Sequence, residues 1–86
     1  MIFIYKDLVS KYIERLTPND IELYAKKNNI NCTPSELNII YSFIKDNYLE
    51  LLNGNIKVLE KIRFNINPIL YKQLLNLYIE YKEKYL

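Results

Sequence analysis

Apolar residues recur along most of the chain with the spacing of an α-helix. Between residues 5 and 16 they fall at i, i+3, i+4, i+7, i+8 and i+11, and charged or polar residues fill the other positions. This period predicts an amphipathic helix of about three turns. Similar spacing predicts helices over 18–28, 34–47 and 68–85. Because the helix over 34–47 carries two apolar rows, we expect it to lie at the centre of the fold.

Three residue pairs mark the starts of these helices: Thr17-Pro18, Thr33-Pro34 and Asn67-Pro68. Threonine and asparagine side chains accept hydrogen bonds from the first free backbone N–H groups of a helix, and proline fits its first turn. Asp20 and Glu36 stand three residues after the two threonines. That spacing predicts two capping boxes, in which each acid returns a bond to the N–H of the threonine.

The segment 48–66 is interrupted by Asn53-Gly54-Asn55. Asn-Gly is also a common hairpin turn, but the flanking residues do not alternate between apolar and polar, which argues against strands. We therefore expect a short turn near 48–53 and then a fourth helix that reaches about residue 64. Earlier in the chain, Asn28-Asn29 predicts a helix end, because asparagine tolerates the left-handed conformation.

These elements predict an all-α fold, a compact bundle of about five short helices that forms a single domain over 1–86. The chain has one glycine and three prolines in 86 residues, and no run of small or polar residues long enough to act as a linker. A chain of this length has room for one domain.

Composition removes several classes of function. The chain contains no histidine and one cysteine, which excludes histidine-based acid–base catalysis, the common zinc sites and an internal disulfide. We expect no enzyme activity, no cofactor and no metal, and a cytoplasmic protein without a membrane span. Cys32 precedes a helix start that could lower the pKa of its thiol, but a buried and unreactive cysteine is the simpler interpretation.

One row of the last helix has the composition of a partner interface. Its members follow a seven-residue repeat: Tyr71, Leu74, Tyr78, Tyr81 and Tyr85. Tyrosine is amphipathic and is enriched at protein interfaces. The row could equally pack into the core of the bundle, with its hydroxyl groups at the rim. We predict that the protein acts by contact with another protein, either as a homodimer or as an accessory subunit.

A second candidate surface is basic. Lys57, Lys61 and Arg63 fall in the predicted fourth helix with Glu60 as the only acid among them. Such a cluster could contact the phosphates of a nucleic acid, and tyrosines could stack on unpaired bases. The net charge of the whole chain is only +2, which is weak for a dedicated nucleic-acid binder. A nucleic-acid or nucleoprotein adaptor is therefore the alternative function.

The order of caps and aliphatic positions also resembles a known family. The residues that carry the likeness are Leu16-Thr17, Asp20, Tyr24, Ile30, Thr33, Ile40, Ile44, Leu59, Ile62, Asn67-Pro68 and Leu77. They resemble short helical proteins of low-GC Gram-positive bacteria that are grouped as a domain of unknown function. The resemblance spans nearly the whole chain and implies a helical fold in a bacterial cytosol. It implies no activity and no functional residues.

Overall fold

The computed structural model describes the backbone of residues 2–85 and the side-chain surroundings of residues 8–84. The described chain forms four α-helices and one 3₁₀ helix: α1 (Ile2–Glu14), α2 (Pro18–Lys27), α3 (Pro34–Leu52), η1 (Ile56–Ile62) and α4 (Pro68–Tyr85). Residues 2–85 contain no strand. The predicted all-α fold of five short helices is confirmed.

The predicted helix starts are confirmed atom by atom. The Thr17 hydroxyl accepts a hydrogen bond from the Asp20 N–H at 3.2 Å, and the Asp20 carboxylate accepts one from the Thr17 N–H at 2.9 Å. Thr33 and Glu36 repeat this capping box at 3.1 and 3.0 Å. The Asn67 side chain accepts from the Ile69 N–H at 2.8 Å, so α4 is capped by asparagine as expected.

The helices α2 and α3 each end at a residue with a positive φ. Asn29 has φ 57°, and the next residue, Ile30, donates its N–H to the Ala25 carbonyl at 2.8 Å. Gly54 has φ 81°, and Asn55 donates to the Glu50 carbonyl at 3.0 Å. Both ends have the six-to-one bond of a Schellman motif, in which a left-handed residue closes the last helical turn.

The position of Gly54 corrects the prediction for 48–53. We expected a turn over these residues, but α3 continues through them to Leu52. Gly54 is the residue of this segment that adopts the left-handed conformation most readily, so the helix runs on until it reaches this position. The chain then turns at 53–55 rather than at 48–53.

The fourth helix is also different from the one predicted. Residues 56–62 form a 3₁₀ helix, with hydrogen bonds from Val58 to Asn55 at 3.2 Å and from Arg63 to Glu60 at 3.2 Å. In a helix with three residues per turn, side chains three positions apart share one face. Ile56, Leu59 and Ile62 have that spacing, and all three pack in or against the core. The apolar row therefore fits η1 better than it fits an α-helix.

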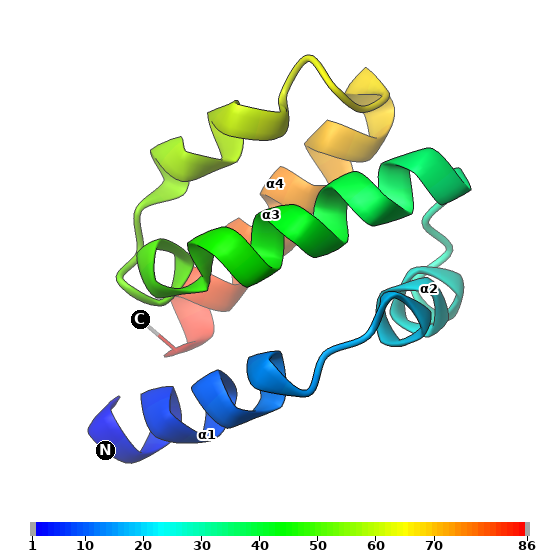
Figure 1. Cartoon of the computed structure of the whole chain (residues 1–86). Coiled ribbons are helices and arrows are strands. Elements are labelled where there is room, and N and C mark those ends of the chain that lie inside the picture. Colours follow the sequence, from blue (N-terminus) through cyan, green and yellow to red (C-terminus); the bar gives the residue numbers. More distant parts are fainter. Residues whose placement is uncertain (1, 86) are drawn as a thin grey trace.

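The helix α3 is the central support of the fold, as predicted. In Figure 1 it crosses the molecule, with α1 and α2 along one side, η1 along the other and α4 behind. Buried side chains from α3, η1, the loop before α4 and α4 itself form one core: Ile40, Phe43, Val58, Leu59, Ile62, Ile66, Leu70 and Tyr78. The core thus lies on the side of α3 away from α1.

The helix α1 is attached through α3. It runs antiparallel to α3 (Figure 1), and among the described residues α3 is the one helix that it approaches closely. The Lys45 ammonium group, on α3, donates to the carbonyls of Ile13 and Glu14, each at 3.0 Å. These carbonyls belong to the C-terminal end of α1, where a helix carries partial negative charge, so Lys45 caps α1 from another element.

Candidate functional site

The tyrosine row of α4 faces the core over its described length. Tyr78 is only 9% exposed, and its hydroxyl donates a hydrogen bond to the Leu51 carbonyl at 2.5 Å. Tyr71, Leu74 and Tyr81 are half-buried and pack against the same core, while the side chain of Tyr85 lies outside the described residues. The described row thus has the core arrangement that the sequence left open. The partner contact predicted for it stays a prediction.

Burial also fixes the chemical state of Tyr78. The surrounding apolar side chains raise the pKa of its phenol, because desolvation penalises the charged form. Its ring stacks on that of Tyr81, with centroids 6.1 Å apart and an angle of 19° between the planes. The phenol therefore stays neutral and acts as a hydrogen-bond donor that ties α4 to the C-terminal end of α3.

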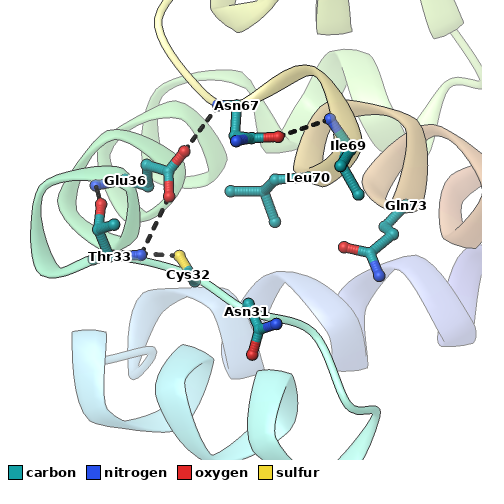
Figure 2. A pocket seen from close by; sticks show the side chains of 8 residues that line it. All are labelled: Asn31, Cys32, Thr33, Glu36, Asn67, Ile69, Leu70 and Gln73. Carbon is teal, nitrogen blue, oxygen red and sulfur yellow. Dashed lines mark hydrogen bonds between the residues drawn. The ribbon is translucent and has the colours of Figure 1, made fainter.

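A polar junction joins the beginnings of α3 and α4. One oxygen of the Glu36 carboxylate accepts from the Thr33 N–H at 3.0 Å, and the other accepts from the Asn67 N–H at 2.6 Å (Figure 2). The hydrogen bond from Thr33 and then that from Asn67 hold the pKa of Glu36 below its ordinary value. One carboxylate therefore serves two helix N-termini, the second of them through Asn67, which is 31 residues from Glu36 in the sequence.

A cavity of about 430 Å³ opens beside this junction. Figure 2 shows the side chains that line it: Asn31, Cys32, Thr33, Glu36, Asn67, Ile69, Leu70 and Gln73. Burial and then the nearby Glu36 charge raise the pKa of the Cys32 thiol, which lies 3.6 Å from the Thr33 carbonyl. The lowered thiol pKa considered from the sequence is therefore wrong, and the unreactive interpretation of Cys32 fits the structure.

The predicted basic residues are exposed, and one of them, Arg63, lies beside an exposed aromatic ring that sequence reasoning missed. Lys57 and Lys61 project from η1, and the Lys61 ammonium group donates to the Asn47 side chain at 2.7 Å. The guanidinium carbon of Arg63 lies 5.4 Å from the centre of the Phe64 ring, and Phe64 is 88% exposed. Val58 is buried although it lies outside the same three-residue row, so the spacing in the sequence does not indicate that Phe64 is exposed.

Two further apolar surfaces remain uncovered. On α1, Leu8 and Tyr12 are 61% and 62% exposed. Between α3 and α4 lies a groove of about 210 Å³, and the described side chains that line it are all aliphatic or aromatic. Tyr24 of α2 stands at this groove and is more than half exposed. These residues belong to the apolar rows of their helices, but apolar spacing does not show how much of a helix its neighbours cover.

Comparison with known proteins agrees with the family resemblance. The chain is a member of a family whose function is not known. Over residues 1–82 it matches the family described as "Protein of unknown function (DUF2624)", and it belongs to that family. No curated protein and no solved structure matches the chain.

Two features of the described part of the chain concern a membrane span and a metal site. None of its helices is both long enough and apolar enough to cross a membrane. The described side chains also contain no group of three or more histidine, cysteine, aspartate or glutamate residues placed to hold a metal ion.

The shared carboxylate predicts a pH-dependent stability. Folding lowers the Glu36 pKa, so its stabilisation is present above the unfolded value of about 4.3 and is lost as the pH falls through the lower folded value. We expect Glu36→Gln to reduce the free energy of unfolding at pH 7 by about 1 kcal/mol. Urea unfolding at a series of pH values between 3 and 7 measures both effects.

Glu83→Gln, at an exposed position of α4, is the matched control for that series and should leave the unfolding curve unchanged. Glu36→Gln should also flatten the dependence of stability on pH below 5. A Glu36→Gln variant with the same acid sensitivity as the original chain would contradict the shared role of the carboxylate.

The buried hydroxyl of Tyr78 predicts a second stability effect. Tyr78→Phe removes the bond to Leu51 while keeping the ring, and we expect a loss of about 0.5–1.5 kcal/mol. Tyr78→Glu should unfold the chain, because an unpaired carboxylate would replace a core side chain. Urea unfolding followed by circular dichroism measures both, with Tyr71→Phe as the control on the same row. A folded Tyr78→Glu variant would show that α4 does not pack as described.

Proposed function

We propose that this chain is a non-enzymatic helical domain that works by contact with another protein. The observation that carries the proposal is its surface area. A folded monomer of 10.4 kDa is expected to expose about 5,400 Å², whereas this chain exposes 6364 Å². The excess of about 1,000 Å² is similar to the ~800 Å² that each partner covers in a typical stable interface.

The character of the exposed surface supports the same proposal. Large apolar side chains stand out from every part of the fold: Leu8, Tyr12, Leu23, Tyr24, Leu49, Phe64, Ile69 and Ile79. Single exposed apolar residues are normal, and these eight give the small domain apolar positions that a partner could contact.

The titratable groups support a non-enzymatic role. The chain has no histidine. Where a pKa is shifted, the group has a structural explanation: Glu36 caps two helices, Tyr78 is bonded to Leu51, and burial keeps the Cys32 thiol protonated. A free cysteine is also in keeping with the reducing cytoplasm, which is where we place the protein.

The size of the protein in a cell extract tests this proposal. A tagged chain, expressed at its natural level, should elute from a sizing column as a species clearly larger than 10.4 kDa. A triple variant with Tyr12→Lys, Tyr24→Lys and Phe64→Lys removes three exposed aromatic side chains, so it should elute as a monomer.

The control for that experiment adds the same charge at exposed polar positions, as Asn38→Lys, Ser42→Lys and Asn76→Lys. This variant should keep the elution volume of the original chain. Elution of the original chain as a monomer in the extract would contradict a function based on protein contact.

The exposed Phe64 favours a second candidate function, the binding of a single-stranded nucleic acid. Its ring is available to stack on a base beside Arg63, and the exposed side chains of Arg63, Lys61 and Lys57 can contact phosphates. The tyrosines first considered for stacking are less suitable, because Tyr78 is buried and Tyr71 and Tyr81 are half-buried.

Salt dependence tests this second candidate. If all three cations contact phosphates, the logarithm of the binding constant for a fluorescent oligonucleotide should fall with a slope of about −2 against the logarithm of salt concentration. Phe64→Ala should weaken binding by about 1–3 kcal/mol, and Lys72→Ala, on α4, should change it little. Anisotropy titrations measure both quantities. A binding constant that does not change with salt would exclude this function.

A further inference from the structure

The groove between α3 and α4 has the chemistry of a docking site for an apolar side chain. Leu51 and Ile44 line it from α3, Leu74 and Leu77 line it from α4, and Leu59 of η1 reaches it through the core. None of the described residues that line the groove is charged. An occupant must therefore present apolar atoms, since a polar group placed there would lose its hydrogen bonds to water.

The chain itself carries an element of the right kind. Leu8 and Tyr12 are four residues apart on α1, so they lie one above the other on the same face of the helix. Both are more than 60% exposed, because α1 packs on α3 and covers only the other part of its apolar face. A helix that enters a groove commonly does so with such a pair of anchors.

We infer that a second copy of this chain fills the groove, with Leu8 and Tyr12 of each copy docked between α3 and α4 of the other. This inference rests on the proposed function and gives the partner an identity. A two-fold arrangement covers both unpartnered surfaces of each chain in one reciprocal contact. The excess of about 1,000 Å² per chain is enough for the ~800 Å² that each partner of a stable dimer covers.

The presence of two uncovered surfaces on one chain favours a second copy over an unrelated protein. An unrelated partner in the groove would leave Leu8 and Tyr12 in water unless it covered α1 as well. A second copy covers both because each chain holds both halves of the contact. The groove is lined by Tyr24 at its α2 side, so Tyr12 of one copy and Tyr24 of the other belong to the same interface.

Opposite charges introduced at the two tyrosine positions test the inference on the purified full-length chain. Light scattering on a sizing column should give the original chain a mass of twice 10.4 kDa. Tyr12→Lys and Tyr24→Glu should each raise the dissociation constant of the dimer at least about tenfold, because a charge enters an apolar contact twice per dimer. Both residues are more than half exposed in one chain, so circular dichroism should show intact helices.

The mixture of the two variants gives the decisive result. In a mixed dimer one contact pairs the new lysine with the new glutamate, and the other contact keeps its two tyrosines, so mixing should restore dimers. Leu23→Glu is the matched control, because Leu23 is exposed on α2 next to Tyr24 but does not line the groove. This control should dimerise like the original chain.

Three outcomes would overturn the inference: a purified chain that is monomeric at every concentration, a dimer that neither variant weakens, or variants whose mixture remains monomeric. These failures are distinct from failure of the proposed function. A chain that is monomeric when pure but part of a larger species in a cell extract would overturn the second copy as partner and retain a function based on protein contact.

Discussion

The carboxylate of Glu36 is the interaction on which the arrangement of the helices depends. The N-terminus of a helix leaves backbone N–H groups without partners, and two such ends meet beside the core. Glu36 accepts from Thr33, at the start of its own helix, and from Asn67, at the start of α4. Because one rigid group bonds both, the position of α4 is fixed relative to α3 at this end, while Tyr78 fixes it at the other end through Leu51.

Between these two attachments the segment that completes the core is a short 3₁₀ helix rather than a long α-helix. The polypeptide must run from the C-terminal end of α3 back along α3 to the beginning of α4 (Figure 1). A 3₁₀ helix rises about 2.0 Å per residue, against 1.5 Å for an α-helix, so seven residues cover more distance. Its three-residue period then brings Ile56, Leu59 and Ile62 to the core together.

Features that depend on nearby residues could be predicted from the sequence. The capping boxes at Thr17 and Thr33 and the left-handed stop at Asn29 each involve atoms within five residues of one another. The turn after α3 was placed too early, because Leu49 and Leu52 suit either a helix or its end. The spacing of η1 also fits two kinds of helix, and only packing against the core distinguishes them.

Features that depend on distant residues could not be predicted. The bond from Asn67 to Glu36 joins two segments whose meeting is a property of the whole fold. The apolar face of α4 contains more positions than a core needs, so its spacing could not show that Tyr78 lies inward. For the same reason the sequence could not show that Leu8, Tyr12 and Phe64 are left outside. The described tyrosine row packs against the core, and the partner contact predicted for it stays a prediction.

The capping of α1 by Lys45 makes one helix depend on another. The last turn of α1 has carbonyls bonded to a side chain more than 30 residues away, which reaches them from the middle of α3. The core, by contrast, is built from α3, η1, the loop before α4 and α4, and it includes no described residue of α1. The structure therefore consists of a body that closes on itself and a first helix whose C-terminal end is satisfied only through that body.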